Sequence, residues 1–290
     1  MRSGGRAAVA STVVESEAHD HDHDRGLAFD LATLSRRRTL ALLGGGALAL
    51  FVGCGSDDDG GAAASSTTST TTTAGSAPGG EACTTIPEET AGPFPGDGTN
   101  GPDVLGADGI VRRDIRSSFG SSSTTAEGVP LVINLRLTDS TGGCSALAGA
   151  AVYVWHCDRE GRYSLYSDGV EGENYLRGVQ EADGDGRVGF TSTFPGAYPG
   201  RWPHIHFEVY ESLDAATGGG TPVATSQIAL PQDACAAVYA TDGYEQSVRN
   251  LAQTSLQRDM VFSDDGGVSQ VGTTTGSVDD GYAVGLAVGV

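Results

Sequence analysis

Residues 194–210 read FPGAYPGRWPHIHFEVY, a proline- and glycine-rich loop followed by an alternating segment. In an extended strand, His204 and His206 lie on one face and the apolar residues beside them on the other. The preceding residues 195–200 contain too much Pro and Gly for a sheet strand, so they predict a rigid loop that folds back over the histidine face. Tyr198 would then lie near both imidazoles.

Two histidines on one strand face supply half of a metal site, and imidazole binds zinc, copper, iron and nickel alike. A phenol narrows the choice, because tyrosine loses its proton only near pH 10 in water and binds as phenolate at neutral pH only to a strongly Lewis-acidic ion. Ferric iron meets that requirement. Taken alone, however, a His-x-His pair on a strand is more often structural than catalytic.

The composition of the chain favours β structure around a single core. With 290 residues, 38% of them hydrophobic and 19% charged, the chain is long enough to bury one sizeable core. Glycine is abundant among short alternating apolar runs, and the clearest helical pattern is confined to residues 246–258. We expect an all-β fold, an antiparallel β-sandwich whose long loops gather at one end and carry the metal site. The expected strands are 131–138, 150–157, 187–193, 204–210, 223–230 and 282–290.

The formal net charge is −20, from 17 basic and 37 acidic residues. So acidic a chain is a poor partner for nucleic acid or for an anionic membrane surface. The charge is more typical of a solubilised, secreted protein.

The first part of the chain resembles an export signal followed by a tether. Residues 1–53 contain Ser35-Arg36-Arg37-Arg38 before a short apolar run that ends in a lipobox-like segment at Cys54. We therefore expect twin-arginine export and a lipid anchor at Cys54, which places the protein at the cell envelope or outside the cell. Residues 54–81 are rich in Ser, Thr and Gly and predict a flexible tether. The catalytic domain is expected over residues 82–290.

Four cysteines remain for the folded domain: Cys83, Cys144, Cys157 and Cys235. An even number in an oxidising compartment predicts two disulfides, and three pairings are possible. A thiolate metal site is disfavoured because no two of these cysteines are closely spaced.

Three fragments occur in a distinctive order. They are Glu89-Thr90-Ala91-Gly92-Pro93-Phe94, then Val154-Trp155-His156-Cys157-Asp158 with Gly161-Arg162-Tyr163, and finally Pro195 to Arg201 leading into His204-Ile205-His206. Together they resemble the intradiol ring-cleavage dioxygenases, the family of catechol and protocatechuate dioxygenases, over about residues 83–262. The first fragment and the export signal are most similar to the secreted branch of that family. Residues 85–95, which include the first fragment, have a Pro and Gly content unsuited to helix or central strand and are expected to lie as an ordered arm over the core.

The resemblance implies a non-haem Fe(III) centre with four protein ligands. By position, Tyr163 would be the equatorial tyrosinate and Tyr198 the axial tyrosinate that substrate displaces. His204 would be the equatorial histidine and His206 the axial histidine. Two phenolates would offset much of the ferric charge and stabilise Fe(III) over Fe(II).

The resemblance also implies a reaction. A catechol would bind the iron through both hydroxyls while Tyr198 accepts one of its protons. The ring would then be cleaved by O2 between the two hydroxyl-bearing carbons to give a cis,cis-muconate-type diacid. Arg201 matches the arginine that stabilises negative charge on the ring, and Gln227 matches a glutamine near the iron.

Other prominent residues have simpler interpretations. His156 shares a strand face with core valines, so we expect a structural histidine and not a fifth ligand. Arg112, Arg113 and Arg116 could contact substrate, but a solvated cluster paired with nearby Asp is the simpler expectation.

Two other functions are compatible with parts of this pattern. A cell-surface binding module for aromatics or a polymer could keep the fold without turnover, although such a module has no need of the full ligand set. A zinc or copper site could serve hydrolysis or redox chemistry, but two tyrosines argue against zinc. No basic residue is assignable to a substrate carboxylate. The expectation is therefore a catechol without one, such as hydroxyquinol or a lignin- or plant-derived diphenol.

Overall fold

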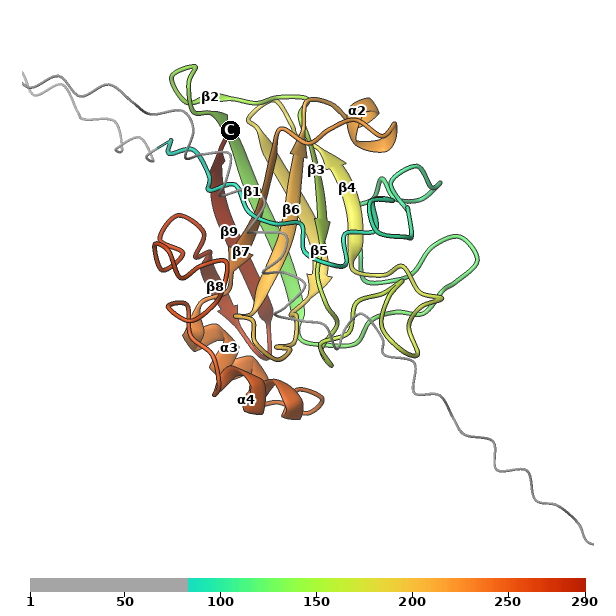
Figure 1. The fold of residues 1–290 in the computed structure, drawn as a ribbon, viewed down its shortest axis with the longest axis vertical. Helices are drawn as coiled ribbons and strands as arrows, with labels where there is room; N and C mark the ends of the chain where they lie inside the picture. The colour runs from blue at the N-terminus through green and yellow to red at the C-terminus, as the bar shows by residue number, and fades with distance from the viewer. Residues whose placement is uncertain (1–82) are drawn as a thin grey trace, which may run out of the picture.

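The computed structural model describes residues 83–290, so the expected signal sequence 1–53, the anchor at Cys54 and the expected tether 54–81 lie outside the described residues. The described chain is built mainly of strands in two sheets, with few helices (Figure 1). The strands are β1 Pro130–Asp139, β2 Ser145–Ala146, β3 Ala151–Trp155, β4 Arg177–Glu181, β5 Arg187–Thr193, β6 His204–Tyr210, β7 Ala224–Ala229, β8 Thr273–Ser277 and β9 Gly281–Gly289. The helices are α2 Leu213–Thr217, α3 Gln232–Tyr239 and α4 Glu245–Leu251.

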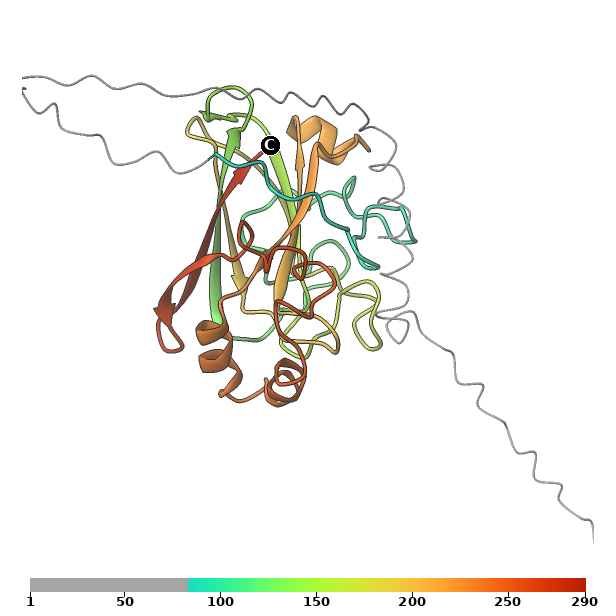
Figure 2. The same cartoon turned by 60° about the vertical axis from the view of Figure 1, so that its left-hand side comes forward.

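The two sheets form separate layers (Figure 2). The first has the order β2-β1-β9-β8, with β5 also paired to β1, and the second has the order β4-β3-β6-β7. Within the second sheet every pairing is antiparallel, and β6 lies between β3 and β7. Helices α3 and α4 lie together at one end of the layers, and α2 lies at the other end (Figure 1).

The main core lies between the sheets and follows from the alternation of the strands. In β1 every second residue is buried, while Asn134 and Arg136 are exposed on the outer face. The same alternation in β6 sends its apolar residues into this core. Members of the core cluster include Leu131 and Leu135 of β1, Val154 of β3, Phe207 of β6 and Val284 of β9.

The second sheet is buried on both faces. Its outer face carries a second apolar cluster that includes Tyr153, Trp155 and Tyr163, with Phe94 from the segment before the first strand. All residues of β3 and β6 are therefore buried. The prediction that the segment around β3 is a central strand, apolar on both faces, is confirmed.

Two expectations about elements are wrong in part. The sheets are not entirely antiparallel, because β9 pairs with β1 in parallel. Alternation identifies β9 as a strand, but it carries no information on strand direction, and the long connection after β7 lets the chain return in the same direction as β1. The helix expected over residues 246–258 ends at Leu251, and the short helices α2 and α3 were not expected.

The cysteine expectation is also half wrong. Cys83 and Cys144 form a disulfide, but Cys157 and Cys235 are buried free thiols. Buried cysteine behaves as a small apolar residue, so a core position explains both without a bond. The disulfide spans 61 residues and fixes the start of the described chain to the turn after β1. In the chain-entropy model, a loop of that length stabilises the fold by about 4 kcal/mol.

Among residues 83–290, no helix has both the length and the apolar character needed to cross a membrane.

Candidate functional site

Strand β6 places His204 and His206 side by side on the face of the second sheet that is turned away from the main core. Both are buried, and their Nε2 atoms are 3.1 Å apart. His206 stacks on Trp155, its neighbour across the β3 ladder, with ring centroids 4.8 Å apart. The two rings therefore aim the same nitrogen at one point, as their two-residue spacing predicts.

Both histidines are held in their neutral form. Burial, together with the positive charge of Arg201, lowers the pKa of His204 to about 3. Burial and the neighbouring His204 lower the pKa of His206 well below its usual value. The Nδ1 atom of His204 lies 2.5 Å from the carbonyl oxygen of Trp202, which can only accept a hydrogen bond. Nδ1 of His204 therefore carries the proton, and Nε2 presents a lone pair.

Two tyrosines complete the cluster. The Tyr198 hydroxyl lies 3.1 Å from Nε2 of His204, so the loop before β6 does fold back over the histidine face. Tyr163 is buried, and its ring lies edge-on to those of Tyr198 and His206. Among residues 83–290, no hydrogen-bond partner within good geometry is found for its hydroxyl. Burial and the neighbouring Tyr198 raise the pKa of Tyr163 well above its usual value.

Two loops hold these tyrosines against each other. Asp158 accepts hydrogen bonds from the backbone N–H groups of Glu160 and Arg162, which fixes the turn that leads to Tyr163. The loop of Tyr198 packs against that turn at Gly196, whose N–H donates to the Asp158 carbonyl at 2.9 Å. A Cβ at Gly196 would lie 2.4 Å from a backbone oxygen, so only glycine permits this approach.

Arg201 is buried beside the histidines in a network of hydrogen bonds. Its Nε donates to Asp259 at 2.9 Å, and its Nη2 donates to the side-chain oxygen of Gln227 at 2.6 Å. Gln227 is the β7 neighbour of His206, and its amide nitrogen donates to the carbonyl of Thr90. The structure thus brings Arg201 and Gln227 together next to the histidine pair.

Asp259 accepts most of the hydrogen bonds that hold this network in place. It is fully buried and accepts further hydrogen bonds from the backbone N–H groups of Trp202, Val261 and Phe262. Burial opposes ionisation of Asp259, but Arg201 and these N–H groups outweigh it and hold its pKa below the usual value.

The arm before the first strand packs over the domain as expected, and it also covers one side of the site. Glu89 donates its backbone N–H to the carbonyl of Thr225, and Phe94 packs on Tyr163 with ring centroids 5.0 Å apart. Gly92, at a positive φ of 72°, lies over His206: a Cβ there would come within 3.3 Å of the imidazole. The arm therefore leaves no room for a side chain above the ring.

Two positions with simple interpretations behave as expected. His156 contacts the carbonyl of Cys157 and the hydroxyl of Ser192, both in the buried interior, so it is a structural histidine. Arg116 forms an exposed ion pair with Asp114, as expected. The expectation of a solvated cluster is wrong for Arg112, which is partly buried and donates to the backbone carbonyls of Ser117, Asn174 and Arg177.

The chemistry of the cluster fits a Lewis-acidic cation. Two neutral imidazoles bring their Nε2 atoms within 3.1 Å, and the buried Tyr163 hydroxyl has no hydrogen-bond partner in the described part of the chain. A cation between these atoms would satisfy them and would lower the phenol pKa values that burial raises. Within residues 83–290 no group of three or more His, Cys, Asp and Glu side chains could hold a metal, so a metal here depends on the tyrosines.

Sequence reasoning missed two important residues. Asp259 lies in a loop with no motif around it, and only the fold shows that it binds Arg201. Arg177 on β4 is buried and donates to the carbonyls of Phe94 and Pro95, so it fixes the arm. The available signal for Arg177 was that a single Arg stands in an otherwise apolar strand segment, but this signal does not predict which groups the Arg binds.

Comparisons with known proteins match this chain to dioxygenases. Residues 112–217 match the family model described as Dioxygenase. The intradiol ring-cleavage dioxygenase from Tetranychus urticae matches with 24% identity and a TM-score of 0.56, over 71% of this chain and 94% of that chain. The dioxygenase domain of a dioxygenase carbohydrate-binding protein fusion from Streptomyces sp. SirexAA-E has 19% identity, a TM-score of 0.46, and coverage of 71% and 98%. Hydroxyquinol 1,2-dioxygenase from Pseudomonas putida has 17% identity, a TM-score of 0.42, and coverage of 70% and 65%.

The family match spans both tyrosines, both histidines and Arg201. The match in fold covers more of the chain than that segment does, and it covers nearly all of the Tetranychus urticae structure. The resemblance inferred from the sequence fragments is thereby confirmed: residues 112–217 match the dioxygenase family model, and the fold is similar to that of a solved intradiol ring-cleavage dioxygenase.

Proposed function

We propose that this β-sandwich domain holds Fe(III) through Tyr163 and Tyr198, which lie in two loops, and through His204 and His206 of β6. We further propose that it cleaves a catechol ring between the two hydroxyl-bearing carbons, with O2, to a cis,cis-muconate-type diacid. The observation that carries the proposal is the convergence of two neutral imidazoles and two phenols on one buried point. When bound, ferric iron would acidify the two catechol hydroxyls and activate the bound ring toward O2.

Protein residues supply the remaining functions. Tyr198 is the more exposed of the two phenols, so its oxygen is the one that can exchange places with substrate and hold one substrate proton. Arg201 carries a fixed positive charge in a buried setting, where it stabilises negative charge on the ring more strongly than it would in water. The arm, at Gly92, and the loop of Tyr163 pack against the His206 ring, so they keep water away from it.

The arrangement of the buried arginines favours a catechol without a carboxylate. Arg201 is engaged by Asp259 and Gln227, and Arg177 by backbone carbonyls of the arm. Both guanidiniums thus already have protein acceptors, and the charge of Arg201 is already paired with the carboxylate of Asp259. Hydroxyquinol and diphenols derived from lignin or plants are the substrate class that we propose.

Isotope labelling tests the reaction directly. The full chain, loaded with ferric iron, is supplied with catechol under ¹⁸O₂, and the ring-opened acid is analysed by mass spectrometry. We expect both heavy atoms in one diacid molecule, and no product above background from Tyr163→Phe. Incorporation of a single heavy atom, or a loaded enzyme that leaves catechol intact, would contradict the proposal.

We also propose that the protein is exported by a twin-arginine signal and anchored by lipid at Cys54. The disulfide between Cys83 and Cys144 supports an oxidising compartment. In cells, Cys54→Ala should move the protein from the membrane fraction to the soluble fraction, while Cys235→Ala, which removes a buried free thiol, should leave it in the membrane fraction. A Cys54→Ala variant that stays with the membranes would rule out the anchor.

A further inference from the structure

The loop before β6 is held by the rest of the domain up to the residue that precedes Tyr198. Every backbone N–H and carbonyl group of residues 194–197 has a hydrogen-bond partner outside the loop, and Pro195 has no N–H to satisfy. The partners are the carbonyls of Val129 and Asp158, the hydroxyls of Tyr239, Tyr244 and Ser247, the thiol of Cys157 and the side-chain amide of Asn250. Side chains supply most of these partners, so the loop has a fixed course without being part of a sheet.

Helix α4 holds both backbone groups of Ala197. The N–H of Ala197 donates to Oγ of Ser247 at 2.9 Å, and Nδ2 of Asn250 donates to the carbonyl of Ala197 at 2.7 Å. Ser247 and Asn250 are three residues apart, so they lie on one face of α4, and both are buried. Figure 1 shows α4 together with α3 at one end of the sheets. A buried, polar helix face thus holds the residue directly before Tyr198.

The backbone is fixed again just after Tyr198. The chain is exposed at residues 199 and 200 and buried again from residue 201, and Asp259 accepts a hydrogen bond from the N–H of Trp202 at 2.6 Å. Pro199 restricts the span in between, because its ring fixes φ. The Cβ of Tyr198 also abuts the neighbouring turn: a Cβ at Gly161 would lie 3.3 Å from it. Tyr198 therefore lies on a short span between two fixed points, and its phenol moves more easily by rotation of the side chain than by movement of the backbone.

We propose that Ser247 and Asn250 are positioning residues for Tyr198, an inference that rests on the proposed function. By fixing Ala197 they keep the Tyr198 phenol close to the metal position, so that a catechol displaces it by rotating the side chain while the backbone stays in place. A phenol held in this way competes with the catechol, because it stays at a high effective concentration. It also stays close enough to hold the substrate proton and to return after the product leaves.

Loosening this hold should change catechol binding and turnover in opposite directions. In Ser247→Ala/Asn250→Leu the phenol is less restrained and competes less well, so the dissociation constant of catechol should fall at least about threefold. The kcat should fall at least about tenfold, because the proton acceptor is no longer held in place. A general loss of structure would instead weaken binding and turnover together. The dissociation constant is measured without oxygen from the shift of the visible band of the iron-loaded full chain, and kcat is measured by steady-state kinetics.

A second readout needs no metal. In hydrogen exchange of the metal-free full chain, the Ala197 amide of the double variant should exchange at least about tenfold faster than that of the parent, because its acceptor on Ser247 is gone. The rate is taken relative to the amides of β1 and β9, whose exchange reports overall stability. Ser247→Ala alone keeps the hydrogen bond of Asn250 and should show the same changes to a smaller degree.

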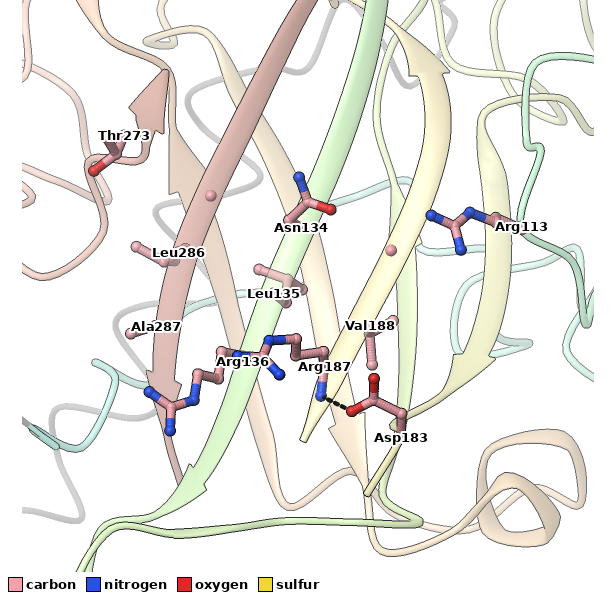
Figure 3. A pocket seen from close by; sticks show the side chains of 12 residues that line it. Arg113, Asn134, Leu135, Arg136, Asp183, Arg187, Val188, Thr273, Leu286 and Ala287 are labelled. Carbon is pink, nitrogen blue, oxygen red and sulfur yellow. Dashed lines mark hydrogen bonds between the residues drawn. The ribbon is translucent and has the colours of Figure 1, made fainter. Parts of the chain in front are cut away.

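Two controls separate positioning from stability. Gln253→Leu also replaces a side-chain amide by leucine, at an exposed position just after α4. Val188→Ala removes packing from the main core on β5, beside the pocket of the first sheet that Figure 3 shows, so it should lower the melting temperature. Both variants should keep the dissociation constant and kcat within about twofold of the parent.

The proposal is overturned if the Ala197 amide of the double variant exchanges at the parent rate, or if the variant binds catechol no more tightly than the parent. Equal effects in Val188→Ala would overturn it as well. A parent chain that takes up no ferric iron would refute the proposed function instead, and the exchange of the Ala197 amide would then decide on its own whether α4 holds the loop.

Discussion

Replacing His206 with glutamine should lower the affinity of the protein for ferric iron more than about 100-fold. In known metal sites, losing a residue that only hydrogen-bonds to a ligand lowers metal affinity about 10- to 100-fold, and losing the ligand itself should cost more. His206 offers its Nε2 to the same point as His204 and Tyr198, and an amide oxygen or nitrogen is a poorer donor than imidazole. Turnover of catechol should fall with iron occupancy. Iron content after dialysis, measured by atomic absorption, checks the first result.

The control for this variant is a second buried histidine outside the cluster. His156→Gln removes a ring that contacts Ser192 and the Cys157 carbonyl, so it should lower stability but leave iron bound. Urea unfolding of both metal-free proteins separates misfolding from ligand loss. Full iron occupancy in a folded His206→Gln protein would show that His206 is not a ligand.

Asp259→Asn should lower the free energy of unfolding by about 3–5 kcal/mol, because it leaves the charge of Arg201 buried without its counter-ion. It should also lower kcat for catechol by about 100-fold, since a shifted guanidinium no longer faces the ring correctly. Iron binding should persist, as the four proposed ligands are untouched. Urea unfolding and steady-state kinetics on the iron-loaded protein measure the two effects.

A double variant distinguishes positioning from mere stability. Arg201→Gln/Asp259→Asn removes both charges of the buried pair, so most of the lost stability should return. The kcat should not return, because the guanidinium itself is missing. If Asp259→Asn alone keeps the parent kcat, Asp259 does not position Arg201 for catalysis.

The sequence predicts the site well where the signal is local. The alternation of His204 to Tyr210 places both imidazoles on one face in any strand, and the Pro and Gly content of the preceding loop turns Tyr198 back toward them. Tyr163 is different, because nothing in its local pattern brings it near β6. The family resemblance supplied that residue, and the structure places its ring beside those of Tyr198 and His206.

What the sequence could not predict depends on contacts between distant residues. Asp259 meets Arg201 across 58 positions, and no local pattern records that pairing. The even number of cysteines likewise predicted two disulfides, whereas Cys157 and Cys235 are free thiols in the core. The direction of β9 could not be predicted for the same reason. Its residues alternate as in any strand, and only its pairing with β1 in the fold shows that the two strands run parallel.

The central claim is a ferric centre with tyrosinate ligands, and the visible spectrum of the full chain tests it most directly. After ferric iron is supplied, the account predicts a burgundy protein with a tyrosinate-to-Fe(III) charge-transfer band. That band should shift when catechol is added without oxygen, because the substrate takes the place of Tyr198. A folded protein that stays colourless with ferric iron present would contradict the account.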